Sequence, residues 1–190
     1  MALVAYVPDP LASFLYRMRQ SFSAPPCPQP HITILPPRPL RVSSESACAR
    51  AQEILQSRHQ FAVELSQVRC FTSTSTLYLD ISEGAPELHT LHDALNGGDL
   101  HHQEEFDFRP HVTVGGPLNP LHLPGILQQA ETDWRAVAYS PRFLLSELVC
   151  LSQGKGNGKT GWQRLWSVKL KPATTIFSRG NEAHGDFQST

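Results

Sequence analysis

The sequence has few charged residues, no excess of either sign and no long apolar segment. Charged side chains make up 17% of the 190 residues, and the formal net charge is −1. A protein that grips long nucleic acid electrostatically carries a basic field, which this balance excludes. No segment approaches the roughly 20 apolar residues that a membrane-spanning helix requires. We therefore expect neither long nucleic acid nor a membrane as a partner.

Cysteine is scarce and poorly spaced for metal or redox chemistry. The four cysteines are Cys27, Cys48, Cys70 and Cys150, and no two of them form a C-x-x-C pair. We expect reduced thiols and no metal site or cofactor. The first residues lack the basic region of a signal peptide, and their apolar run stops at Pro8. These features indicate a cytoplasmic protein, which we expect to be a monomer.

Apolar periodicity and turn residues predict an α+β chain. Alternating apolar residues predict strands, and apolar residues three or four positions apart predict helices with one buried face. At 190 residues the chain is long enough to bury a stable hydrophobic core without disulfide bonds or a structural metal ion. The expected strands cover 3–7, 31–35, 61–71, 76–82, 111–114, 143–152 and 162–171, and the expected helices cover 10–20, 44–58, 86–96 and 120–132.

One order of elements occurs twice along the chain, as strand, helix, strand, helix and two strands. Two histidine-bearing strands lie 80 residues apart, and 61–71 aligns with 142–152 at nearly the same offset. This indicates an internal duplication rather than a repeat array. We expect a single bilobal domain over 1–171, with lobes of about 1–82 and 83–171. The sequence leaves open whether the two lobes exchange strands. Residues 172–190 are expected to form a polar tail.

The two histidine-bearing strands carry the same five-residue pattern, PHITI at 30–34 and PHVTV at 110–114. Histidine and threonine are two positions apart on a strand, so both side chains leave the same face. The intervening apolar residues face the other way and can anchor the strand in the core. A chance match of H-x-T is common, but its repetition at matching places in two similar halves is not. The candidate site consists of His31, Thr33, His111 and Thr113.

Two imidazoles and two hydroxyls suit chemistry at a phosphoryl group. One histidine can deprotonate an attacking water while the other protonates the leaving oxygen, and the threonines can donate to the non-bridging oxygens. The residues alone do not assign the acid and the base.

On these motifs, the sequence resembles the two-histidine (2H) phosphoesterase superfamily, which includes bacterial 2′-5′ RNA ligases and RNA cyclic phosphodiesterases. The resemblance covers roughly residues 2–171 and rests on the tetrads HITI at 31–34 and HVTV at 111–114. It implies two pseudo-twofold-related lobes, each an antiparallel sheet flanked by helices, around a V-shaped central cleft. It also implies metal-independent chemistry, with His31 and His111 as the acid/base pair and Thr33 and Thr113 as phosphate ligands.

The sequence departs from relatives of the RNA ligase type after the second motif. Those relatives often carry a basic residue there, whereas this chain has Gly115, Gly116 and Pro117. Arg38 or Arg109 is a candidate for supplying the cation, although an arginine at either place is more commonly a solvated residue at a strand end. Phe71 closes a strand that could border the cleft, where a base could stack on it, or it could belong to the core.

Two other features carry less weight. The segment 154–160, GKGNGKT, lacks the first glycine of a phosphate-binding P-loop and precedes a strand-like stretch, so we interpret it as a hairpin loop whose lysines could still meet a substrate phosphate. His89 and His92 are three apart on an expected helix, and His101 and His102 follow. No carboxylate or cysteine lies at a spacing typical of a metal site, so we expect all four histidines to be surface residues.

These observations predict a phosphodiesterase that hydrolyses 2′,3′-cyclic phosphates, or makes and breaks 2′-5′ linkages, at RNA ends or on small nucleotides. Two alternatives remain open. One is a non-catalytic module that binds a nucleotide or RNA end in the same cleft. The other is a phosphodiesterase for a non-RNA cyclic phosphate, such as an ADP-ribose derivative.

Overall fold

Local signals in the sequence start and stop the elements of the fold. Ser43 caps the second helix by accepting a hydrogen bond from the Ser46 amide at 3.2 Å. Gly84 adopts a φ of 86° in front of the third helix, where a Cβ would lie 2.5 Å from the Ala62 carbonyl oxygen, so only glycine fits this turn. These two helices thus begin where the sequence places a capping residue and a turn glycine.

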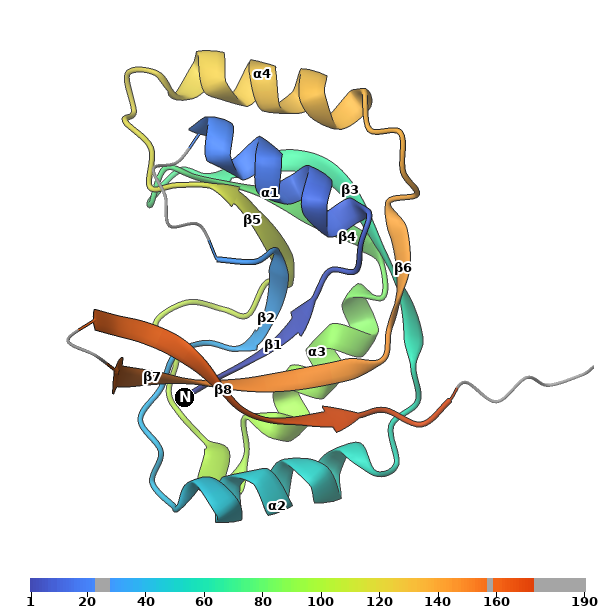
Figure 1. The fold of residues 1–190 in the computed structure, drawn as a ribbon, viewed down its shortest axis with the longest axis vertical. Helices are drawn as coiled ribbons and strands as arrows, with labels where there is room; N and C mark the ends of the chain where they lie inside the picture. Colours follow the sequence, from blue (N-terminus) through green and yellow to red (C-terminus); the bar gives the residue numbers. More distant parts are fainter. Residues whose placement is uncertain (23–27, 157–158, 173–190) are drawn as a thin grey trace, which may run out of the picture.

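The computed structural model (Figure 1) describes residues 1–22, 28–156 and 159–172, with the side chains of 154–156 and 159–160 left out. The expected tail at 172–190 lies almost wholly outside the described residues, as does Cys27. The described helices are α1 (Leu11–Phe22), α2 (Ser44–Leu55), α3 (Ala85–Leu95), the short η1 (Gly98–Leu100) and α4 (Leu123–Arg135). The described strands are β1 (Ala2–Tyr6), β2 (His31–Leu35), β3 (Phe61–Phe71), β4 (Thr76–Glu83), β5 (His111–Gly115), β6 (Arg142–Leu145), β7 (Glu147–Gly156) and β8 (Lys159–Lys169).

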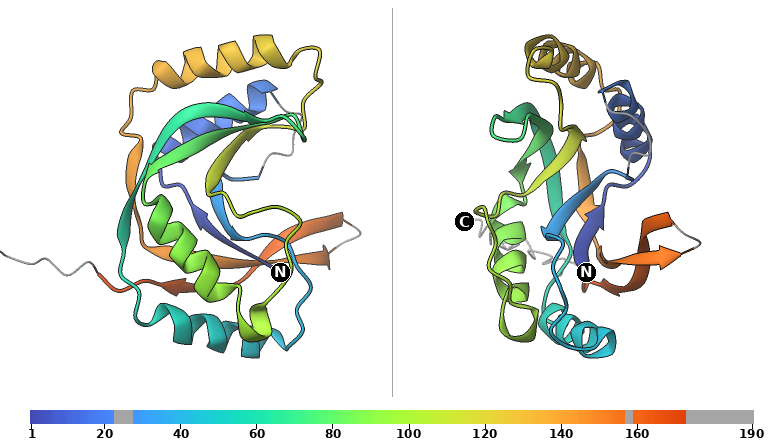
Figure 2. Two further views of the ribbon diagram at one scale, coloured as in Figure 1. Left: turned by 180° about the vertical axis from the view of Figure 1, so that it is seen from behind. Right: turned by 90° about the vertical axis from the view of Figure 1, so that its left-hand side faces the viewer.

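The strands form an antiparallel sheet in the order β6-β3-β4-β5-β2-β1-β7-β8. The order is pseudosymmetric about its centre, because β5 and β2 each carry a histidine motif and each is followed outward by three strands. Figure 1 shows the sheet strongly curved, and the right-hand view of Figure 2 looks onto its open side, where β2 and β5 run side by side. The α+β class, with antiparallel strands flanked by helices, is therefore confirmed.

Two helices cover each half of the sheet. Helices α1 and α4 contact β5 and β3, whereas α3 and α2 contact β2 and β8, as Figure 1 shows. Both helix pairs bury leucine and alanine against the sheet in one continuous core. None of the helices in the described ranges is both long and apolar enough to span a membrane.

The expected strand over 143–152 is two strands. The chain breaks at Ser146, so that β6 pairs with β3 at one edge of the sheet while β7 pairs with β1 in the other half. An apolar run has the same pattern whether it serves one strand or two, which is why periodicity alone missed the break. Each half of the sheet thus combines strands that are distant in sequence, and the division of the chain into lobes at 82 and 83 remains a proposal.

Strands β7 and β8 form a β-hairpin, not a phosphate-binding strand–loop–helix. Strands β7 and β8 pair along their length, and the stretch that follows the glycine-rich segment is a strand rather than the helix a P-loop requires. The hairpin interpretation is confirmed, while residues 157–158 lie outside the described residues.

Candidate active site

The two motif strands bring their histidines and threonines onto one face of the sheet. Ile32 pairs with Val112 in the antiparallel ladder, and both are fully buried on the opposite face. This register places His31 opposite Thr113, and Thr33 opposite His111. Each imidazole therefore faces a hydroxyl from the other strand. The four side chains, which the sequence separates by about 80 residues, form one cluster.

Both imidazoles are held in the same tautomer by the backbone two residues upstream. His31 Nδ1 lies 2.7 Å from the Gln29 carbonyl oxygen, and His111 Nδ1 lies 2.7 Å from that of Arg109. Because a carbonyl oxygen only accepts, each Nδ1 carries a hydrogen and donates it. A neutral ring then has its lone pair on Nε2, so each histidine presents Nε2 for proton exchange.

Burial lowers the pKa of both histidines. For His31, desolvation dominates, the hydrogen bond to Gln29 opposes it, and the positive charge of Arg19 adds to the lowering. For His111, desolvation is again the largest cause, and the nearby His31 and Arg109 lower its pKa further while Asp80 opposes them. The charge of His31 is thus one of the causes that lower the pKa of His111.

Three adjoining cavities open around the cluster. A cavity of about 390 Å³ is lined by His31, Thr33 and Thr113, and a second of about 420 Å³ by Thr33 and His111. A third, of about 510 Å³, shares His111 with the second and extends away from β2. Together they form a cleft with the histidines at its centre and space on both sides.

Arg19 lies in this cleft and was missed by the sequence analysis. It comes from the last turn of α1, lines the cavity that contains His31, Thr33 and Thr113, and donates to the Pro28 carbonyl at 3.5 Å. Nothing in its local sequence distinguishes it from other helical arginines, because only the packing of α1 brings it to the motifs. It supplies a positive charge beside His31.

The His111 side of the cleft contains a cluster of aromatic and charged residues. Phe71 stacks on Tyr78 with ring centroids 4.0 Å apart and meets the His111 ring edge-on at 5.0 Å. The Arg109 guanidinium lies 5.3 Å from the Tyr78 centroid and pairs with Asp80 at 3.3 Å. The structure thus places two predicted residues, Phe71 and Arg109, in the walls of the cleft.

Arg38 lies elsewhere, in the protein interior. Its side chain is only 2% exposed, and its guanidinium pairs with Glu104 and donates to Asn96 and Leu100. It is neither a solvated strand-end residue nor among the residues that line the three cavities. The expectation that Arg38 contacts substrate is not supported, because its donors are already taken by protein acceptors.

His92 is also buried, which corrects the expectation of a surface histidine. It is 5% exposed, and its ring packs on Phe108 with centroids 4.0 Å apart. The apolar positions of α3 already indicated a buried face, and His92 lies on that face one residue after buried Leu91.

Among the described residues, no group of three or more histidine, cysteine or acidic side chains is placed to hold a metal ion.

Comparison with known proteins agrees with this geometry. Residues 7–157 match the family model described as the 2′-5′ RNA ligase superfamily. No curated protein matches the chain in sequence.

Solved structures with the same fold include E. coli LigT and TT0787 of Thermus thermophilus. The apo form of E. coli LigT superposes with a TM-score of 0.63 at 16% identity, covering 90% of this chain and 96% of that one. LigT complexed with 3′-AMP gives a TM-score of 0.60 at 16% identity, with 90% and 96% covered. TT0787 of Thermus thermophilus gives 0.59 at 15% identity, with 90% and 99% covered. At these identities the likeness establishes the fold alone.

Proposed function

This chain belongs to the 2′-5′ RNA ligase superfamily, and from that premise we propose that it is a phosphodiesterase acting on 2′,3′-cyclic phosphates, or on 2′-5′ linkages, at RNA ends or on small nucleotides. One observation carries the proposal. Two histidines, each with Nδ1 tied to a carbonyl and Nε2 left for chemistry, share one cleft with two threonines. This arrangement supplies a general acid and a general base without a further group.

In the proposed hydrolysis of a cyclic phosphate, a water oxygen forms a bond to phosphorus as the bond to one ribose oxygen breaks. The neutral histidine takes the water proton at Nε2, and the protonated histidine donates its Nε2 proton to the leaving oxygen. The products are a ribose hydroxyl and a phosphomonoester at the neighbouring oxygen. The two histidines exchange protonation states, so the next turnover requires a proton shift through solvent.

The threonine hydroxyls and nearby arginines stabilise the negative charge on phosphorus. Thr33 and Thr113 each lie beside the opposing histidine, where a hydroxyl can donate to a non-bridging oxygen. Arg19 and Arg109 lie on opposite sides of the histidine pair, in different cavities. They supply the positive charge that a basic residue after the second motif would supply, which this sequence lacks. The positive charge of Arg19 in the cavity beside His31 suits one phosphate group better than a long nucleic acid.

The cleft has aromatic surfaces for nucleotide bases. Phe71 and the exposed Phe106 line the cavity beside His111, and Trp162 lines the cavity beside His31. Bases stack favourably on such rings without regard to sequence. E. coli LigT has been crystallised with 3′-AMP, with ATP and with NADP+. These nucleotide complexes of a protein with this fold support nucleotide recognition in the cleft.

The pH dependence of the reaction follows from the lowered pKa of both histidines. Activity needs one ring neutral and one protonated, so we expect a bell-shaped dependence of kcat/KM with its maximum on the acid side of the ordinary histidine pKa of about 6.5. A bound phosphodiester anion favours protonated rings, so the kcat maximum should lie at higher pH. Initial rates across roughly pH 4.5 to 9 measure both; a kcat/KM maximum above about pH 7.5 would contradict the assignment.

A panel of cyclic phosphates tests the substrate class. Wild-type protein is incubated with nucleoside 2′,3′-cyclic monophosphates, an oligoribonucleotide ending in a cyclic phosphate, a 2′-5′-linked dinucleotide and ADP-ribose 1″,2″-cyclic phosphate. Phosphorus NMR then reports which bond breaks, and parallel reactions contain EDTA. We expect turnover of an RNA-type substrate that EDTA does not abolish. Binding of nucleotides by calorimetry without any product would instead indicate the non-catalytic module.

A further inference from the structure

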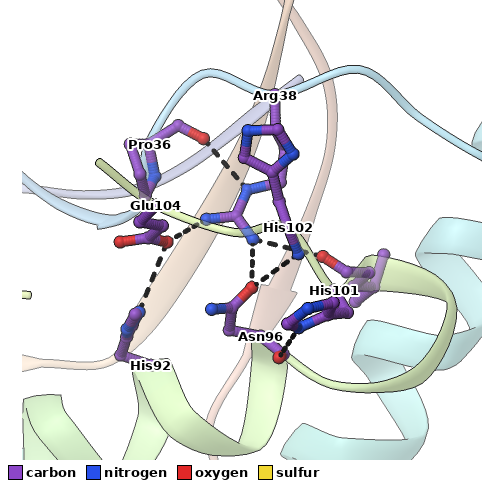
Figure 3. Close-up of polar contacts among 8 residues, drawn as sticks. Pro36, Arg38, His92, Asn96, His101, His102 and Glu104 are labelled. Carbon is purple, nitrogen blue, oxygen red and sulfur yellow. Dashed lines mark hydrogen bonds and ion pairs between the residues drawn. The ribbon is translucent and has the colours of Figure 1, made fainter. Parts of the chain in front are cut away.

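Arg38 and Glu104 form a buried ion pair between the end of β2 and the segment that precedes β5 (Figure 3). Their side chains are 2% and 13% exposed. Arg38 uses its other donors as well, reaching Asn96 Oδ1 at 2.6 Å and the Leu100 carbonyl at 3.1 Å. A guanidinium with this many fixed acceptors is held in one orientation.

The pair holds a segment that has no helix or strand of its own. Residues 101–110, which we call the strap, run from η1 to the start of β5 without regular structure. Asn96 fixes the beginning of the strap, because its Oδ1 also accepts from the His102 amide at 3.0 Å. Glu104 fixes the middle through Arg38. Figure 3 shows these contacts converging on the arginine.

The strap forms a wall of the cleft beside His111. Its residues 102–109 line the cavity that contains Thr33 and His111, and 106–109 line the larger cavity that contains Phe71. The strap also contains the Arg109 carbonyl, which accepts the hydrogen bond from His111 Nδ1. The position of the strap therefore decides the shape of two of the three cavities.

His92 packs behind the strap and leaves Arg38 as the charged partner of Glu104. Its Nε2 lies 3.4 Å from Glu104 Oε1, and its ring packs on Phe108 of the strap. Burial lowers the pKa of His92, with Glu104 and Asp93 opposing this and Arg38 and His89 adding to it. The His92 ring thus packs against the strap, while Arg38 balances the charge of the Glu104 carboxylate.

We propose that Arg38 and Glu104 are positioning residues for substrate binding, because their ion pair holds the strap as the wall that binds the substrate group next to the scissile phosphate. The inference rests on the proposed function for its kinetic test. Removing one member of a buried pair leaves the other charge without a partner, and the strap must move to hydrate it. The histidine and threonine side chains stay on β2 and β5, whose ladder does not involve the pair. The Arg109 end of the strap is tied to β4 by the ion pair with Asp80, so the hydrogen bond from His111 to the Arg109 carbonyl is retained.

The kinetic test compares Arg38→Met, Glu104→Gln and the double variant on the best nucleotide substrate of the panel. We expect each single variant to raise KM at least about tenfold while kcat changes less than about threefold. The double variant should recover part of the loss, because no unpaired charge remains. The control is Arg50→Met with Glu53→Gln, an exposed pair on α2, which should leave KM unchanged.

Glu104→Gln separates positioning from a simple field effect. It removes a negative charge from a cavity that holds an anion, so a field effect alone would lower KM, whereas loss of positioning raises it. A lower KM in this variant, or a loss in kcat as large as the rise in KM, would overturn the proposal.

Hydrogen exchange of the strap amides in the substrate-free protein provides a readout that does not depend on activity. Exchange over 101–110 should rise at least about tenfold in Arg38→Met, with β2 and β5 unchanged, and unaltered strap exchange would overturn the proposal. If the wild type hydrolyses no substrate, the proposed function fails while this measurement still decides the role of the pair.

Discussion

Alanine in place of either His31 or His111 is expected to lower kcat for cyclic phosphate hydrolysis about 10³-fold. The two rings act on opposite sides of phosphorus, one removing a proton from water and the other protonating the leaving oxygen. Neither can do both in one step, so each single variant should lose most turnover. The double variant should be little worse than either single one, because groups that act as a unit are not additive.

Folding and binding must be separated from chemistry in this measurement. Each variant should bind a nucleotide product with nearly wild-type affinity, as measured by calorimetry. His122→Ala is the matched control, because His122 is exposed in front of α4 and its side chain caps nothing. Added imidazole should restore part of the rate to His31→Ala and His111→Ala through the vacated space. Wild-type kcat in His111→Ala would falsify the paired-histidine mechanism.

Valine in place of Thr33 or Thr113 is expected to lower kcat about 10²-fold. Valine keeps the shape and the strand propensity of threonine but removes the hydroxyl, so the transition state loses one donor to a non-bridging oxygen. The opposing histidine keeps its Nδ1 hydrogen bond, since that bond goes to the backbone. KM should change little, because charge on these oxygens grows mainly in the transition state.

Serine provides the discriminating comparison for the threonines. Thr33→Ser and Thr113→Ser retain the hydroxyl and should stay within about tenfold of the wild-type kcat. Thr132→Val serves as the control, because Thr132 is exposed on α4 and its hydroxyl donates to the Gln128 carbonyl. Equal losses in the serine and valine variants would show that packing, not the hydroxyl, accounts for the effect.

The motif strands illustrate what local pattern can reveal. Alternation put Ile32 and Val112 on a buried face, and both are fully buried in the structure. The same alternation required histidine and threonine to share the other face. This information is local because a strand repeats every two residues, whatever it pairs with. The duplicated pattern then indicated that two such strands belong to one site.

The partners that bury Arg38 and His92 could not be predicted from local sequence pattern. Both are polar residues that composition would place at the surface, yet both are buried because charge or packing partners reach them from distant segments. Glu104 lies 66 residues from Arg38 in sequence. No periodicity reports such a pairing, since its benefit exists only once the chain has folded.

The sequence by itself determined the α+β class, most element boundaries and the four side chains of the candidate site. Those properties depend on side-chain spacing within single elements. Tertiary structure alone decided that Arg19 enters the cleft, that the 143–152 run splits at Ser146 between two halves of the sheet, and that Arg38 pairs with Glu104 of the strap. These depend on contacts between segments far apart in the chain, whose free energy comes from burial that no local stretch can achieve alone.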